Sequence, residues 1–239
     1  MTSHNMKPVA IFRFSPIEGP GYFSEFLDKH GIPWSMIRVD EGDSLPIDAS
    51  AYSGVCLMGG PMSVNDPLPW IPKVLSMVRD AFVKDIPLIG HCLGGQLISK
   101  GLGGRVKRNS VKEIGWSQLL PAKTSEAAKW FGPYANEPFT VFQWHGETFE
   151  IPMQANLVAT NDYCTNQIFT LGPHLAMQCH VEMTAEMIAA WCEHWESEDS
   201  FPSATVQTPM QISKQLERNI PYLRLIADSL YSCWISGLK

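Results

Sequence analysis

Short apolar runs and longer amphipathic segments alternate through the first hundred residues. The apolar runs, which predict β-strands, cover residues 9–14, 34–39, 55–58 and 87–90. The segments that predict helices cover residues 21–30, 72–84 and 95–100. The runs LMGG and PLIG are apolar at nearly every position, as expected for strands covered on both faces. The pattern therefore predicts an α/β protein with a doubly wound, mainly parallel sheet.

The pattern changes between residues 104 and 182. Extended segments with few helical periods follow one another here, at residues 116–120, 140–144, 157–160, 167–171 and 175–181. Successive strands without helical crossovers are typical of antiparallel pairing. We therefore expect an antiparallel extension of the same sheet.

The C-terminal part returns to helical spacing. Thr184 can cap a helix at its N-terminus, and the apolar positions that follow are Met187, Ile188, Trp191 and Trp195. A polar loop is expected at residues 197–208, and residues 210–238 predict one or two helices broken near Pro221. We expect residues 1–200 to form one domain and residues 201–239 to be a helical extension packed on it. The alternative is that this extension forms a dimer or partner interface.

Composition narrows the class of partner. The chain has 239 residues, of which 45% are apolar and 18% are charged, a composition typical of soluble globular proteins. The net charge of −6 argues against a nucleic-acid partner. The start MTSHNMKPVAIFRF lacks the pattern of a signal peptide, and no run of about 20 apolar residues predicts a membrane span. The expectation is a cytoplasmic protein with a small-molecule partner, whose six cysteines are free thiols.

The segment GHCLGGQ, residues 90–96, places Cys92 between glycines, after a predicted strand and before a predicted helix. Strand, Gly-x-Cys-x-Gly and helix form the arrangement of a nucleophile elbow, in which nearby glycines relieve crowding at a sharp turn. The start of a helix also favours a thiolate. The local motif alone fits equally well a buried cysteine beside a glycine-rich helix start.

A second segment, AMQCHVEMT, contains a candidate base, for which a solvated strand end before a helix is the alternative interpretation. If the predicted strand continues to residue 182, the period of two places Gln178, His180 and Glu182 on one face, and Cys179 on the opposite, apolar face. A carboxylate beside an imidazole fixes its tautomer and stabilises its charged form. His91 is a poorer base for Cys92, because adjacent side chains on a sharp turn point apart.

Metal binding is an alternative for some of the same residues. The metal-competent types are Cys92, His180, Glu182, Cys192 and His194. None of their pairs has the usual ligand spacing, so we expect neither a metal nor another cofactor.

Three motifs together resemble the class I glutamine amidotransferase family, whose triad is Cys, His and Glu. GHCLGGQ matches the nucleophile motif, CHVE matches the motif of the other two members, and LMGGPMSVND at residues 57–66 resembles the oxyanion loop. The resemblance covers about residues 7–195 and implies a flavodoxin-like sheet. This chain has HVE where many relatives have His-Pro-Glu, and it has neither a P-loop nor a Ser-Gly-Gly-x-Asp nucleotide motif.

The resemblance implies a reaction and a set of site residues. Cys92 is the nucleophile that forms a γ-glutamyl thioester from glutamine, and His180 and Glu182 complete the catalytic triad. The resemblance assigns the oxyanion hole to the backbone N–H groups of Gly60 and Leu93. The implied substrate-binding residues are Gln96, Trp144 and His145, the last of which has an ordinary hydrogen-bonded histidine as its alternative interpretation.

The segments QWHGETFEIP and GGPMSVND are most similar to the stand-alone, GMP-synthase-like branch of the family. Two enzymatic hypotheses follow: a glutaminase that passes ammonia to a synthetase partner, and a stand-alone γ-glutamyl peptide hydrolase. A non-catalytic binding module on the same fold is the third hypothesis.

Overall fold

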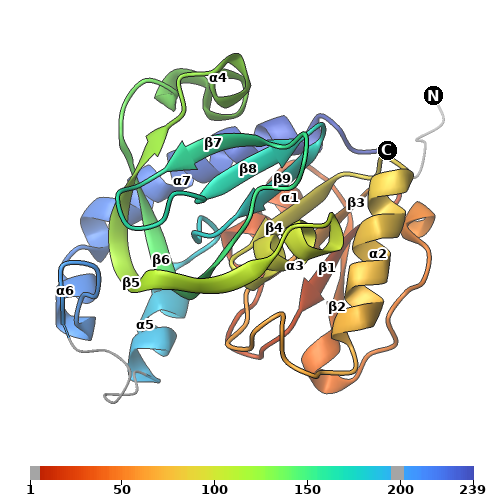
Figure 1. Cartoon of the computed structure of the whole chain (residues 1–239), viewed down its shortest axis with the longest axis horizontal. Helices are drawn as coiled ribbons and strands as arrows, with labels where there is room; N and C mark the ends of the chain where they lie inside the picture. The colour runs from red at the N-terminus through yellow and green to blue at the C-terminus, as the bar shows by residue number, and fades with distance from the viewer. Residues whose placement is uncertain (1–5, 195–201) are drawn as a thin grey trace.

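The computed structural model describes residues 6–194 and 202–239, and within them nine strands form one sheet (Figure 1). The strands are β1 (Val9–Arg13), β2 (Trp34–Arg38), β3 (Gly54–Leu57), β4 (Leu88–His91), β5 (Val106–Pro121), β6 (Phe139–Phe149), β7 (Asn156–Thr160), β8 (Ile168–Leu171) and β9 (His174–Met177). The α-helices are α1 (Tyr22–Lys29), α2 (Ile71–Val83), α3 (Leu93–Gly101), α4 (Ser125–Phe131), α5 (Ala185–Glu193), α6 (Pro209–Ser213) and α7 (Leu216–Ile235). Short 3₁₀ turns cover Val39–Glu41, Ala49–Ala51 and Gly132–Tyr134.

The sheet combines a parallel and an antiparallel part. Its strand order is β2-β1-β3-β4-β9-β8-β7-β5-β6. The neighbours from β2 to β9 pair in parallel, whereas those from β9 to β6 pair antiparallel. The expected α/β fold, with a mainly parallel sheet and an antiparallel extension, is confirmed.

The parallel strands inside the sheet, from β1 to β9 in its strand order, are buried on both faces. Along β1, Val9 and Ile11 belong to one hydrophobic core, which also contains the apolar side chains of α1 and α7. Ala10 and Phe12 point to the other core, which contains the apolar side chains of α2 and α3. The near-continuous apolar runs of the sequence therefore reflect two helical layers, one on each face (Figure 1).

Several local expectations need correction. The strand expected at residues 175–181 ends at Met177, and His180 forms only an isolated bridge to Phe142. Helix α4 lies where few helical periods were found; Thr124 caps it by accepting a hydrogen bond from the N–H of Ala127. The cap expected at Thr184 is confirmed, because its side chain accepts a hydrogen bond from the N–H of Met187.

The break between the C-terminal helices lies at a different position from the one expected near Pro221. Pro221 lies inside α7, and the break falls before Leu216 instead. Burial of one side of the helix, including Tyr231 and Trp234, stabilises it despite the hydrogen bond that a proline removes. Helix α7 packs on α1, α4 and β6. Trp195 and the first part of the expected polar loop lie outside the described residues, and no described helix is long and apolar enough to cross a membrane.

Candidate active site

Cys92 occupies a sharp turn between β4 and α3. Its backbone has φ +49° and ψ −107°, a conformation that only glycine adopts readily. A Cβ on Gly94 would collide with the backbone carbonyl of Leu57, and one on Gly90 would collide with the backbone of Gly94. These close approaches explain why the turn needs glycines two positions before and two positions after the cysteine.

The Cys92 thiol lies at the edge of a pocket. Cys92 is 7% exposed, and its Sγ lies 3.8 Å from the carbonyl oxygen of Trp144 and 3.6 Å from Nε2 of Gln178. As residue preceding α3, it lies at the N-terminal end of the helix, where the helix dipole favours an anion. The thiol is therefore both accessible from the pocket and placed where a thiolate is stabilised.

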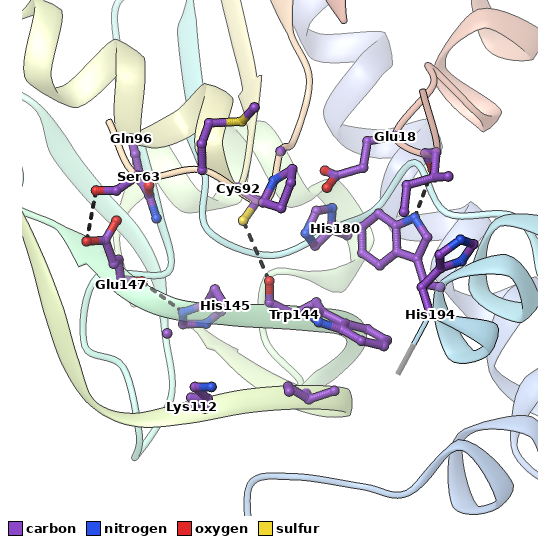
Figure 2. A pocket seen from close by; sticks show the side chains of 17 residues that line it. Glu18, Ser63, Cys92, Gln96, Lys112, Trp144, His145, Glu147, His180 and His194 are labelled. Atoms are coloured by element: carbon purple, nitrogen blue, oxygen red, sulfur yellow. Dashed lines mark hydrogen bonds between the residues drawn. The ribbon is translucent and has the colours of Figure 1, made fainter. Parts of the chain in front are cut away.

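His180 and Glu182 form a buried pair, and Figure 2 shows the imidazole of His180 beside Cys92. Nδ1 of His180 lies 2.6 Å from Oε1 of Glu182, and the His180 N–H donates a hydrogen bond to the carbonyl of Phe142. Nε2 of His180 is buried without a hydrogen-bond partner among the described residues. The expected alternation of a continuous strand is absent, yet the backbone bridge to Phe142 still holds the imidazole toward the thiol.

Charge decides the protonation of this pair. Burial alone would lower the pKa of His180, but the adjacent Glu182 carboxylate and Cys92 outweigh it, so the pKa is raised well above its usual value. Burial acts to raise the pKa of Glu182, and the imidazoles of His91 and His180 outweigh burial and lower it. The arrangement favours an imidazolium paired with a carboxylate.

His91 lies on the other side of Glu182 from the pocket. It is fully buried, its Nε2 is 3.0 Å from the hydroxyl of Tyr231 and 3.8 Å from Oε2 of Glu182, and burial lowers its pKa. His91 is absent from the pocket lining that contains Cys92. This position fits the expectation that His91 is a poor base for the neighbouring cysteine. Cys179 is fully buried in the core, as expected, although the strand ends before it at Met177.

The pocket has a volume of about 580 Å³. Of the residues expected at the site, its lining contains Cys92, His180, Gly60, Gln96, Trp144 and His145. Gln96 donates a hydrogen bond to the side chain of Gln178, and the indole of Trp144 packs edge-on against Trp191. Leu93 does not line the pocket, although its side chain approaches Gly60 closely. Glu182 is set behind His180.

The predicted site residues omit several charged groups, among them Lys112 and Glu147 of the pocket lining. Glu18, after β1, lines the pocket and is only 9% exposed. Glu113 is in contact with His145: Oε2 of the Glu113 carboxylate lies 3.1 Å from Nε2 of the His145 imidazole. Among the described residues, Glu113 and His145 form with Cys164 a group of metal-competent side chains that differs from the set considered above. Hydrogen bonds from Asn161 and Gln167 already occupy the Glu113 carboxylate, which favours a structural role.

The order of the strands brings these residues together. Glu18, Gly60, Cys92 and His180 follow β1, β3, β4 and β9, which are adjacent and parallel in the sheet. Their carboxyl ends therefore meet at one edge, where open α/β sheets bind ligands. His145 and Trp144 come from β6, in the antiparallel part.

The chain is similar to known proteins over most of its length. A sequence profile of the family "Glutamine amidotransferase class-I" matches residues 25–188. The crystal structure of a glutamine amidotransferase from Methylobacillus flagellatus is similar, with 39% identity, a TM-score of 0.95, and coverage of 98% of this chain and 96% of the other. A glutamine amidotransferase from Thermotoga maritima has 27% identity, a TM-score of 0.85, and coverage of 97% and 99%.

Gamma-glutamyl peptidase 3 of Arabidopsis thaliana is 26% identical over 178 residues, which are 70% of this chain and 71% of the relative. The family profile spans most of the chain and includes Cys92 and His180. From the fold, the pocket and these similarities, the chain belongs to the class I glutamine amidotransferase family.

Proposed function

We propose that the protein hydrolyses the γ-glutamyl amide bond of glutamine through the triad Cys92, His180 and Glu182. The observation that carries this proposal is the geometry at Cys92: a strained turn presents the thiol beside a buried imidazole that a carboxylate orients at 2.6 Å. The nucleophile thus lies beside its base, and the base lies beside the group that orients it, as covalent catalysis by a triad requires.

The proposed reaction has two halves. The Cys92 thiolate attacks the side-chain amide carbon of glutamine, and the C–N bond breaks as Nε2–H of His180 protonates the leaving nitrogen. Ammonia leaves, and a γ-glutamyl thioester remains on Cys92. Water then attacks the thioester while His180 accepts its proton, which releases glutamate and restores the thiolate.

We assign the oxyanion hole to the backbone N–H groups of Gly60 and Leu93. Gly60 lies in the loop after β3, and Leu93 is the first residue of α3. A Cβ on Gly60 would lie 2.6 Å from the side-chain atom Cδ2 of Leu93, so the loop after β3 packs against the residue that follows Cys92. Neither N–H has an acceptor in the part of the chain that the structure describes. Both are therefore available for the developing negative charge.

The glutamate part of the substrate is assigned to the side of the pocket that contains Gln96, His145 and Glu147. Glu147 accepts a hydrogen bond from the hydroxyl of Ser63, and Gln96 lies in the first turns of α3 (Figure 2). These polar groups suit the ammonium and carboxylate of a glutamate unit better than an apolar ligand would. Trp144 lines the pocket next to the thiol, with its carbonyl oxygen 3.8 Å from Sγ of Cys92.

A second candidate function is the hydrolysis of γ-glutamyl peptides. The similarity to gamma-glutamyl peptidase 3 over most of the chain favours it. The chemistry at Cys92 is the same, but an amine larger than ammonia leaves. In the glutaminase version, a synthetase partner in trans would use the ammonia; we propose a cytoplasmic location for either version.

The test compares two products from the same protein: ammonia from glutamine and the amine released from a γ-glutamyl peptide, each with wild type and Cys92→Ser. The expected result is turnover of at least one substrate by wild type and a loss of roughly 10³-fold or more in Cys92→Ser. A rise in glutaminase activity on addition of a partner would favour the glutaminase version.

The non-catalytic alternative is tested by intact mass. A glutamine-analogue electrophile should add once to wild type, at Cys92, and not to Cys92→Ser. Cys179→Ser is a matched control, because that thiol is buried in the core and should leave the adduct unchanged. Full activity in Cys92→Ser, or no adduct at Cys92, would overturn the proposed mechanism.

A further inference from the structure

Glu18 is a buried carboxyl group that the proposed triad does not use. It lies in the loop between β1 and α1 and lines the pocket. Only 9% of the residue is exposed, and its carboxyl group has no hydrogen-bond or ion-pair partner among the residues that the structure describes. The carboxyl oxygens are not among the fully buried atoms that lack a partner, and Glu18 lines the pocket, so a polar group of a bound substrate can reach them.

The position of Glu18 is on the His180 side of the thiol. A Cβ on Gly59 would collide with Oε2 of Glu18 and would lie 3.1 Å from Cε1 of His180. Figure 2 shows Glu18 and His180 on one side of Cys92, with Gln96, Ser63 and Glu147 on the other. The thiol therefore separates two halves of the pocket, each with its own carboxyl group.

The reaction assigns these halves to the two parts of a substrate. His180 must reach the leaving nitrogen to protonate it, so that nitrogen lies on the His180 side when the C–N bond breaks. The glutamate unit then extends to the opposite side. Glu18 is thus beside the leaving group, on the side where Trp191 packs against His180 and where His194 also lines the pocket.

We propose that this side of the pocket is the leaving-group subsite and that Glu18 selects the leaving amine. The inference rests on the proposed function and specifies its substrate class. The Glu18 carboxylate accepts a hydrogen bond from N–H of the leaving nitrogen, and it repels a carboxylate attached near that nitrogen. Ammonia, simple amines and peptides whose second residue is itself amide-linked are accepted; amino acids with a free α-carboxylate are disfavoured.

The protonation of Glu18 supports this role. Burial raises its pKa to about 7, and the charge of His180 partly opposes this rise. The group can therefore exist as a carboxylate near neutral pH. The proton given to the leaving nitrogen still comes from His180, so Glu18 changes binding and orientation without altering the proton balance.

The test uses two substrates that differ in one charge: γ-glutamylglycine and γ-glutamylglycinamide. Glutamine is added as a third substrate to separate ammonia from an organic amine. We measure kcat and KM for wild type and Glu18→Gln. Glu25→Gln is the matched control, since Glu25 is exposed on α1 and outside the pocket. Glu147→Gln removes the carboxylate of the opposite half.

Wild type should prefer the glycinamide by roughly tenfold or more in kcat/KM above the pKa of Glu18. Glu18→Gln should reduce this preference by about tenfold and raise kcat/KM for γ-glutamylglycine. Glu25→Gln should change neither value. Glu147→Gln should lower kcat/KM by a similar factor for all three substrates.

Equal kcat/KM for the two glycine compounds in wild type would overturn the inference, and this measurement needs no variant. An unchanged ratio in folded Glu18→Gln would overturn it as well, whatever the loss of total activity. Failure of the proposed function looks different: no γ-glutamyl compound is cleaved and no adduct forms at Cys92. Turnover of glutamine alone, with neither glycine compound cleaved, would overturn the organic-amine part of the inference.

Discussion

At the scale of single residues, the site depends on charges held out of water. The imidazole of His180 and the carboxylate of Glu182 are both about 99% buried, and each shifts the pKa of the other toward the charged form. Glu182 does not line the pocket, yet it should affect catalysis strongly, because its charge determines whether the imidazole of His180 is protonated.

Glu182→Gln should remove the charge that raises the pKa of His180, and burial should then lower that pKa. The raised pKa of His180 contributes stability that is fully present below the usual pKa of histidine and is lost as pH rises through the higher folded pKa. We expect kcat to fall roughly 10²- to 10⁴-fold in the variant, with the alkaline limb of the pH profile moved to lower pH. The pH dependence of kcat/KM and of denaturant unfolding measures both effects. An alkaline limb at the same pH in both proteins would contradict this assignment.

At the scale of elements, the turn between β4 and α3 is the feature that the sequence predicts best. Three glycines close to one cysteine, between an apolar strand and a helix, indicate a tight turn through local chemistry alone. The strand before His180 is predicted less well. The alternation of polar and apolar residues continues past residue 177, but the strand ends there because its pairing with distant segments ends.

Gly94→Ala should disrupt the turn. Its Cβ would collide with the backbone carbonyl of Leu57, which cannot rotate away as a flexible side chain could. The expected cost is about 1–3 kcal/mol or more in the free energy of unfolding, with reduced alkylation of Cys92 by iodoacetamide. Gly103→Ala is a useful comparison, because nothing lies near its Cβ position and only its positive φ is affected. Equal stability of Gly94→Ala and wild type would show that the close approach is relieved at no cost.

At the scale of the whole molecule, the C-terminal helix α7 reaches the back of the site. Tyr231 lies 3.0 Å from Nε2 of His91, and His91 in turn lies 3.8 Å from Glu182. All three are buried and come from segments far apart in the chain. A helix that contributes no residue to the pocket lining is thereby connected to the orienting carboxylate.

Tyr231→Phe should leave the packing of α7 intact and leave His91 without its hydroxyl partner. A buried polar group that loses its partner costs about 1–3 kcal/mol, measurable by urea unfolding. Activity should fall only a few-fold, because the thiol and His180 keep their positions. Tyr222→Phe, at an exposed position on the same helix, is the control and should have no effect. Identical unfolding curves for Tyr231→Phe and wild type would rule out this contribution.

The amino-acid sequence determined what local chemistry can determine. Alternating apolar runs and amphipathic segments predicted the layered α/β sheet, because each strand and helix must bury its own apolar positions. The glycines around Cys92 predicted the turn, and the spacing of His180 and Glu182 predicted a pair whose members could interact. These features depend on residues close to one another in the chain.

Only the tertiary structure decided what surrounds the thiol. Glu18, Gly60, Cys92 and His180 meet because β1, β3, β4 and β9 are adjacent in the sheet, an order that no local pattern encodes. The burial that raises the pKa of Glu18, like the charge that raises that of His180, acts across this edge. Electrostatic effects depend on distance and exclusion of water, and both are set by packing between distant segments.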